Sequence, residues 1–211
     1  MDILYKDKNY IVCIKPSGIA SQQDPNSKIT MLTLLEQELK QQVYAVHRLD
    51  KPVAGLMVYA CTKQSADDFS KAIQQGTFYK EYYAVLKGTP EKASDRLEDL
   101  LFHDTKRNKT YVVKKKRKGV RTAILEYQII AQQQGYTLVR VHLLTGRTHQ
   151  IRVQFASRGL PLIGDGTYGG GKGKIGLWSR KLVFPDPESK AKKEFSVDPV
   201  GIPPFDIFTI L

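Results

Sequence analysis

The chain has little cysteine and no long apolar run, and both absences narrow what it can be. Cys13 and Cys61 are the only cysteines among 211 residues. They are too few for a disulfide framework and lack the Cys-x-x-Cys spacing of zinc sites, so we expect neither disulfide nor metal. No stretch approaches the roughly 18 uninterrupted apolar residues of a membrane helix, and the amino terminus lacks the apolar run of a signal peptide. We therefore expect a cytoplasmic protein that does not enter a membrane.

Acidic residues are outnumbered by basic ones. The chain has 33 Lys and Arg against 21 Asp and Glu, a formal charge of +12, while 41% of its residues are apolar. This balance favours a polyanionic partner without choosing between RNA and DNA. Much of the excess lies in residues 114–121, between β-rich runs at 109–113 and 122–130, which predicts a basic hairpin with Gly119 in its turn. The segment is either a phosphate-contacting arm or a solvated, self-repelling loop.

Strand-like and helix-like segments alternate without a repeat period or a long linker, so we predict one domain over residues 1–211. The expected fold class is α+β, with a mixed, largely antiparallel central sheet and flanking helices. Helices are predicted at 30–40 and 148–156, and another from a capping-box-like pattern at Ser65 to Gly76. The predicted strands are 9–14, 55–60, 79–87, 110–114, 121–131 and 136–144.

Residues 47–53, with the sequence His-Arg-Leu-Asp-Lys-Pro-Val, form the most informative motif of the chain. They place the carboxylate of Asp50 near the cation of Arg48, and the apolar run at 55–60 that follows indicates a buried strand. Asp50 would then lie where a loop meets a rigid scaffold, which suits a catalytic group. An Asp shortly before a Pro is also a common turn former, so this motif alone leaves both interpretations open.

The predicted helix at 148–156 raises a similar question about Arg152. If Ile151 and Phe155 face the core, Arg152 lies about 100° from Ile151 around the helix axis, at the border of the buried face. There it could meet a carboxylate from another segment. Helix geometry alone favours an ordinary surface arginine.

A glycine-rich stretch at residues 166–173 nearly matches the phosphate-binding loop of nucleotide-hydrolysing enzymes. It fails at the last position, where Gly173 replaces the Ser or Thr that would hold magnesium, and residues 174–176 are a poor helix start. A flexible loop is the better interpretation, with RNA contact as one option.

Several segments in order resemble the motifs of the RluA-type pseudouridine synthases. The matching segments are 47–50 with Gly55 and Leu56, 80–88, 145–153, 159–165 and 168–169, together with 3–5 and 14–18. The resemblance covers essentially the whole chain and implies the pseudouridine synthase fold. It further implies isomerisation of uridine to pseudouridine in RNA by one aspartate, with neither a metal nor an organic cofactor.

The resemblance assigns roles to three residues. Asp50 would be the catalytic aspartate, which attacks the flipped uridine either at the sugar C1′ or at the base. Tyr82 would be the tyrosine that stacks on the target base, and Tyr83, on the opposite face of the strand, would be structural. Arg152 would pair with Asp50 and stabilise its charged form. A carboxylate, an arginine and an aromatic ring meet the needs of breaking and re-forming a glycosidic bond.

The remaining candidates would bind RNA. His47 and Arg48 would fill the space that the flipped base leaves or contact the backbone. The basic segment and the motif at 145–153 add Lys114, Lys115, Lys116, Arg117, Arg147 and His149. The expected partner is structured RNA, either tRNA or rRNA, and the protein is expected to be a monomer.

Some positions depart from the family pattern. Val53 and Ala54 replace a usual Thr-Ser pair, which removes hydroxyls near the catalytic loop, and Gln154 replaces a usual His. Because the resemblance begins at residue 3, we expect the catalytic domain without the amino-terminal S4-like domain of many relatives. The rival interpretation is a catalytically inactive RNA-binding protein. Asp50 argues against it, because a phosphate-binding surface gains nothing from a carboxylate.

Overall fold

The computed structural model describes residues 2–25 and 27–209, so both ends of the predicted domain at residues 1 and 211 lie outside the described part. The chain divides into two compact units. The first comprises residues 1–80 and 178–197, and the second comprises residues 81–177 and 198–211. Two compact units can belong to one domain, so the single domain stays a prediction.

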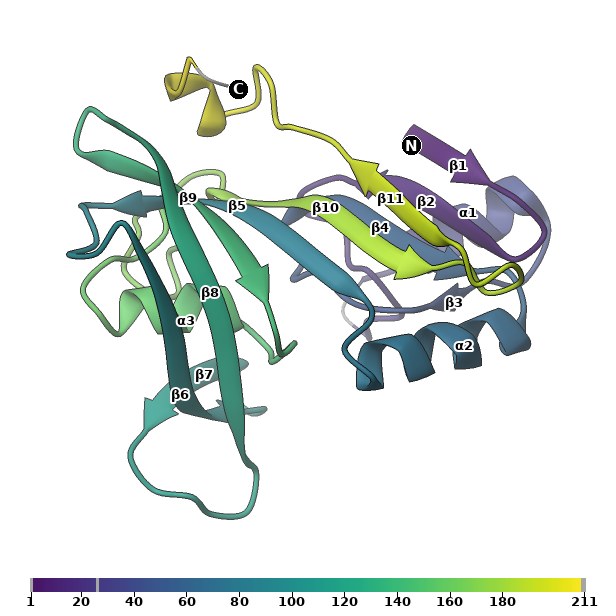
Figure 1. The fold of residues 1–211 in the computed structure, drawn as a ribbon, viewed down its shortest axis with the longest axis horizontal. Helices are drawn as coiled ribbons and strands as arrows, with labels where there is room; N and C mark the ends of the chain where they lie inside the picture. Colours follow the sequence, from purple (N-terminus) through teal and green to yellow (C-terminus); the bar gives the residue numbers. More distant parts are fainter. Residues whose placement is uncertain (1, 26, 210–211) are drawn as a thin grey trace. The chain divides into compact units, whose positions relative to one another are not determined.

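The first unit is built on a mixed sheet (Figure 1). Its elements are β1 (Asp2–Lys6), β2 (Tyr10–Lys15), α1 (Met31–Leu39), β3 (Tyr44–Ala45), β4 (Ala54–Ala60), α2 (Lys63–Gln74), β10 (Leu177–Pro185) and β11 (Lys192–Ser196). The strand order is β1-β2-β4-β10, with β3 also paired to β4 and β11 to β10. Only the β4 and β10 pair is parallel among these pairings. The predicted strands at 9–14 and 55–60 and the helix at 30–40 are confirmed.

An aromatic cluster fills the core of this unit. Phe69 of α2 meets Tyr10 of β2 and Phe184 of β10 edge to face, with ring centroids 5.6 and 5.2 Å apart. The prediction that α2 begins at Ser65 is wrong by one turn. Thr62 is the N-cap, because its backbone is extended and its hydroxyl accepts a 3.1 Å hydrogen bond from the Ser65 amide.

The second unit contains an antiparallel sheet in the order β5-β9-β8-β6-β7. Its elements are β5 (Tyr79–Lys87), β6 (Ser94–Asp104), β7 (Lys109–Val113), β8 (Val120–Gln133), β9 (Tyr136–Leu143), α3 (Gln150–Ala156) and the 3-10 turn η1 (Phe205–Ile207). The predicted strands of this unit are confirmed within two residues at each end. The predicted helix at 148–156 is confirmed as α3, and Ile151 and Phe155 are buried.

The predicted basic hairpin is wrong, because β7 and β8 do not pair with each other. Both pair with β6, and Leu100 of β6 lies opposite Val113 on one side and Thr122 on the other. Residues 114–119 therefore cross from one side of β6 to the other. Gly119 does lie in a turn, with a φ of 85° and a hydrogen bond from the Val120 amide to the Arg117 carbonyl.

The glycine-rich stretch at 166–173 is not followed by a helix, so it lacks the geometry of a phosphate-binding loop. Both cysteines are free thiols, Cys13 buried and Cys61 partly exposed. Among the described residues, every helix is too short or too polar to span a bilayer.

Gly55 at the start of β4 is required by its surroundings. Its φ is 116°, and a Cβ there would collide with the Ser179 backbone, 2.6 Å from the nitrogen. We predict that Gly55→Ala lowers the free energy of unfolding by more than about 2 kcal/mol through backbone strain and displacement of β10. Gly18→Ala is the matched control, since Gly18 has a φ of 87° and open space around its missing Cβ. Equal losses in urea denaturation would rule out the steric explanation.

Candidate active site

The segment that carries Asp50 is a closed turn directly before β4. The Val53 amide donates to the Asp50 carbonyl at 2.9 Å, so Asp50 lies where a loop meets the sheet, as predicted. Residues 17–21 hold the turn from the side. The bonds join Gly18 to Lys51 at 2.8 Å, Ser17 to Pro52 at 2.7 Å and Ser21 to Leu49 at 2.7 and 3.0 Å. The backbone around Asp50 is therefore well fixed.

Lys15 lies under this turn with no exposed surface. Its ammonium donates to the carbonyls of Pro16, Ile19 and Lys51, at 2.9, 2.7 and 3.2 Å. Burial lowers the pKa of Lys15 to about 8, and the charge of the Asp50 carboxylate opposes that shift. Sequence reasoning missed this residue because a fully buried lysine is rare. The available signal was a lysine that ends the apolar run of β2 before a Pro-Ser-Gly turn.

His47 and Arg48 differ in their exposure and in their contacts. Nε2 of His47 accepts the Val58 amide at 3.2 Å, and its ring packs on Phe78 at 5.6 Å. Nδ1 is shielded from solvent and has no hydrogen-bond partner among the residues that the structure describes. Burial, with a smaller effect of Lys80, lowers the pKa of His47 to about 3. Arg48 is exposed. Of the two, Arg48 is placed to reach a ligand, and the contacts of His47 are with its own unit.

In the second unit, Arg152 is buried rather than superficial. Its Nε and Nη2 donate to the two oxygens of Asp165 at 2.7 and 2.9 Å, and both side chains are at most 5% exposed. The Tyr168 ring lies 5.2 Å from the guanidinium carbon. Asp165 and Tyr168 belong to matched motif segments, but the sequence alone indicated no role for them.

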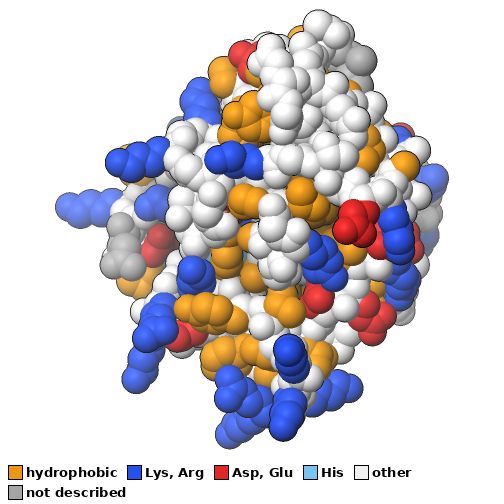
Figure 2. All heavy atoms as spheres, turned by 90° about the vertical axis from the view of Figure 1, so that its left-hand side faces the viewer, with side chains coloured by type: hydrophobic (Ala, Val, Ile, Leu, Met, Phe, Trp, Pro, Cys, Tyr) orange, Lys and Arg blue, Asp and Glu red, His pale blue; other side chains and the backbone are white. Residues whose placement is uncertain are grey.

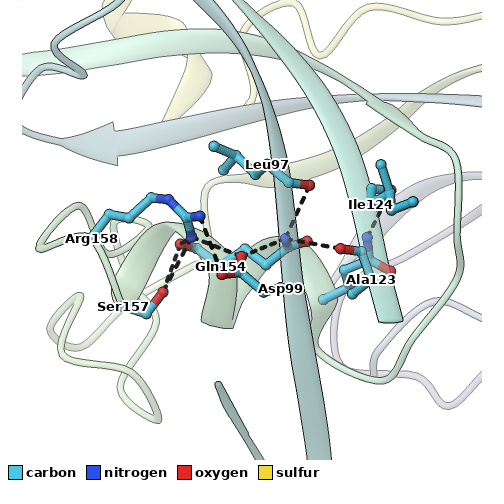
Figure 3. Close-up of polar contacts among 8 residues, drawn as sticks. Leu97, Asp99, Ala123, Ile124, Gln154, Ser157 and Arg158 are labelled. Carbon is cyan, nitrogen blue, oxygen red and sulfur yellow. Dashed lines mark hydrogen bonds and ion pairs between the residues drawn. The ribbon is translucent and has the colours of Figure 1, made fainter. Parts of the chain in front are cut away.

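Gln154 anchors the helix of Arg152 to the sheet (Figure 3). Its amide nitrogen donates to Asp99 of β6 at 2.7 Å and lies 3.4 Å from the carbonyls of Leu97 and Ala123. Nη1 of Arg158 bridges Asp99 and the Gln154 carbonyl at 2.9 and 2.8 Å. The side-chain oxygen of Gln154 is buried without a partner among the described residues. This clamp fixes α3 and therefore the backbone of Arg152.

Tyr82 lies on the face of the sheet that packs against α3. It pairs with Val141, which pairs with Tyr127, and cross-strand partners share a face. The Tyr127 ring lies 5.4 Å from Phe155 of α3. Tyr83 points to the opposite face, since side chains alternate along a strand. Tyr82 and Arg152 thus belong to the same side of the second unit.

The remaining RNA-binding candidates fall into two groups. Lys114, Lys115, Lys116 and Arg117 are exposed, as is Arg147, whose Nε donates to the Thr122 carbonyl at 3.0 Å. Figure 2 shows Lys and Arg side chains gathered at the lower end of its view, where Figure 1 has the loop from β7 to β8. His149 is buried, and its Nδ1 lies 2.9 Å from the Tyr168 hydroxyl.

Asp50 belongs to the first unit, and Tyr82 and Arg152 belong to the second. The pairing of Asp50 with Arg152 therefore stays a prediction. Within the described residues, no group of three or more His, Cys, Asp or Glu side chains is arranged to hold a metal ion.

The partly buried His47 predicts a pH dependence of stability. Its pKa of about 3 in the folded chain lies below the ordinary value of 6.5, so the unfolded chain binds the extra proton between these values. The free energy of unfolding should fall with decreasing pH across this window, by at most about 1.4 kcal/mol per pH unit from this group. His47→Gln should flatten the slope in urea titrations. Parallel slopes in wild type and His47→Gln would contradict this.

The buried ion pair predicts a second effect on stability. Asp165→Asn should lower the free energy of unfolding by about 3 kcal/mol, because it removes the carboxylate that compensates a buried guanidinium. Glu126→Gln is the control, since Glu126 and its partner Arg96 are 47% and 50% exposed. There we expect a loss below about 1 kcal/mol. Losses of the same size in both variants would argue that the Arg152 pair contributes no more than a surface pair.

Comparisons with known proteins identify the family. The family model for RNA pseudouridylate synthase matches residues 9–157. The chain is 30% identical to the dual-specificity RNA pseudouridine synthase RluA of Yersinia pestis, over 94% of this chain and 98% of that protein. It is 34% identical to the ribosomal large subunit pseudouridine synthase D of Haemophilus influenzae, over 81% of this chain but 53% of that protein. A further relative, an RNA pseudouridine synthase of Aquifex aeolicus, is matched over 56% of its length.

Solved structures share the fold of this chain. Human RNA pseudouridylate synthase domain containing 1 superimposes with a TM-score of 0.78 at 20% identity, covering 94% of this chain and 83% of that chain. Human RNA pseudouridylate synthase domain containing 4 gives 0.77 at 21% identity, over 93% and 88%. These likenesses show the fold and confirm the predicted α+β class with a mixed, largely antiparallel sheet. The chain belongs to the RNA pseudouridylate synthase family.

Proposed function

We propose that this chain is an isomerase that converts uridine to pseudouridine in structured RNA, with Asp50 as its catalytic aspartate. The observation that carries the proposal is a carboxylate on a fixed turn above a buried ammonium, in a chain of this family. A site for this reaction needs a preorganised anionic group more than it needs a flexible one. The turn at residues 49–53 meets that need.

The reaction breaks the bond between N1 of the base and C1′ of the sugar and forms a bond from C5 to C1′. The carboxylate of Asp50 bonds transiently either to C1′, as N1 leaves with the bonding electrons, or to the base. This bond breaks again on the way to product, C5 loses its proton to a basic group, and N1 takes up a proton from solvent. The detached uracil must turn while it is held, which suits stacking on the ring of Tyr82. Arg152 would hold Asp50 in its charged form, and no cofactor is needed for these steps.

The environments of Tyr82 and Arg152 support these roles. Both lie on the α3 side of the second unit, and Arg152 is fixed by Asp165 at 2.7 Å. A rigid guanidinium loses little freedom when it meets a substrate or a carboxylate.

The exposed cations would hold the RNA. Lys114, Lys115, Lys116 and Arg117 lie on the crossing loop, and Arg117 covers the Phe102 ring at 4.9 Å. Cations interleaved with aromatic rings are typical of surfaces that contact nucleic acid. Arg48 would occupy the space that the flipped base vacates.

The substrate is proposed to be rRNA or tRNA. One relative is a ribosomal large subunit pseudouridine synthase and another is a dual-specificity RNA pseudouridine synthase, which supports a structured RNA as the substrate. A cytoplasmic location and a monomeric state complete the proposal.

The test compares Asp50→Asn with wild type in two assays, pseudouridine mapping of total RNA and RNA affinity. We expect product formation to fall more than about a thousandfold, because the nucleophile is lost, while affinity changes less than about twofold. Asp67→Asn, on the exposed side of α2 in the same unit, is the matched control and should leave both values unchanged.

Other outcomes would point elsewhere. Loss of product and affinity together would indicate a structural role for Asp50. Wild-type product from Asp50→Asn would reject it as the catalytic group. Failure of the wild type to form pseudouridine in any RNA would favour the catalytically inactive RNA-binding protein.

A further inference from the structure

Tyr168 is the point where three segments of the second unit converge on Arg152. Its ring lies 5.2 Å from the guanidinium carbon, close enough for attraction between the cation and the ring. Asp165, on the same loop, binds the edge of that guanidinium through two hydrogen bonds. We infer that Tyr168 is a positioning residue for Arg152. Both the ring and the hydroxyl of Tyr168 contribute to this role. The kinetic consequences of this inference rest on the proposed function, whereas its structural consequence does not.

The hydroxyl of Tyr168 joins β7 to the turn that begins α3. It accepts the Thr110 amide at 2.8 Å and lies 2.9 Å from Nδ1 of His149. Thr110 also donates its own hydroxyl to the Thr148 carbonyl at 2.9 Å. Burial raises the pKa of Tyr168, so the hydroxyl stays protonated and can donate to the imidazole while it accepts from the amide.

The contact between Tyr168 and His149 stabilises an uncommon backbone conformation at His149. Its φ of 55° and ψ of 22° lie in the left-handed region, which residues with side chains rarely adopt. Such conformations persist only where surrounding contacts enforce them, and they concentrate at functional sites. His149 is the N-cap of α3 and makes no side-chain capping bond to the helix. The contact with Tyr168 holds this strained residue at 8% exposure, one turn before Arg152.

The same hydroxyl links Arg152 to the basic segment. Thr110 is in β7, which ends at Val113 and continues directly into Lys114. A force on that segment, such as contact with phosphates, would reach Tyr168 through one strand and one hydrogen bond. Tyr168 therefore joins the surface proposed to bind RNA to the arginine proposed to assist the chemistry.

This assignment also changes the expected role of His149. A histidine that touches RNA should affect affinity when it is replaced, whereas a member of a positioning cluster should affect the rate at saturating RNA. The two roles are therefore separable by kinetics on His149→Asn, which keeps a side chain that tolerates the left-handed conformation.

The experiment measures single-turnover rates of pseudouridine formation at saturating RNA, RNA affinity and the melting temperature. Tyr168→Phe keeps the ring and removes the hydroxyl, and Tyr168→Leu removes both. We expect Tyr168→Phe to slow the reaction about tenfold and Tyr168→Leu about a hundredfold, with affinity within about twofold of wild type. Tyr136→Phe, at the start of β9, is the control and should match wild type.

Tyr168→Phe is the decisive variant, because it keeps the ring and nearly the whole volume of the side chain. The test therefore stands even if Tyr168→Leu does not fold. A wild-type rate for Tyr168→Phe would overturn the inference. A loss of affinity with an unchanged rate would also overturn it, because Tyr168 would then be an RNA contact.

A measurement without RNA separates this inference from the proposed function. Hydrogen exchange of the Arg152 Nε–H, followed by NMR, should be faster in Tyr168→Phe than in wild type or Tyr136→Phe. Unchanged exchange would mean that Tyr168 does not restrain the guanidinium. If the wild type made no pseudouridine at all, the proposed function would fail, and this exchange rate would still decide whether Tyr168 positions Arg152.

Discussion

The cost of burying a positive charge is the constraint on which both parts of the proposed site depend. An isolated cation in a protein interior is strongly unfavourable, so each buried cation must gather partners around itself. Lys15 gathers three backbone carbonyls, which draws residues 16–19 and Lys51 onto one point. Arg152 gathers the carboxylate of Asp165 and the ring of Tyr168. In each unit the solvation of one cation fixes the loop around it.

The surroundings of Lys15 and Arg152 differ in whether they neutralise the buried charge. Carbonyl dipoles solvate the ammonium of Lys15 without neutralising it, and the remaining charge interacts with Asp50, as the opposing influence on the Lys15 pKa indicates. Asp165 compensates the charge of Arg152 within its own unit. The ammonium of Lys15 therefore attracts the Asp50 carboxylate. Arg152 adds a rigid, planar set of donors whose direction Asp165 fixes.

The sequence predicts individual segments better than it predicts their neighbours. The limits of β5 were predicted correctly, because its apolar run is bounded by clear breaks. The sequence does not indicate the strand β6, because charged residues interrupt its alternation. Without β6, the pattern predicts a hairpin of the two strands that lie on either side of it. Burial of Lys15 and the pairing of Arg152 with Asp165 depend on which loops meet in space. Periodicity along the chain carries no information about such meetings.

The positions that depart from the family pattern lie beside well-bonded backbone. The turn at Asp50 closes through the bond from the Val53 amide to the Asp50 carbonyl, and the hydroxyls of Ser17 and Ser21 bind the backbone carbonyls of Pro52 and Leu49. At position 154, the amide of Gln154 shares the Asp99 carboxylate with Arg158, at the cost of one buried oxygen without a partner among the described residues. An unpaired buried acceptor costs about 1–3 kcal/mol, and two bonds to a carboxylate offset a loss of that size. Both substitutions thus keep the backbone of a proposed catalytic residue fixed while they change the side chains that fix it.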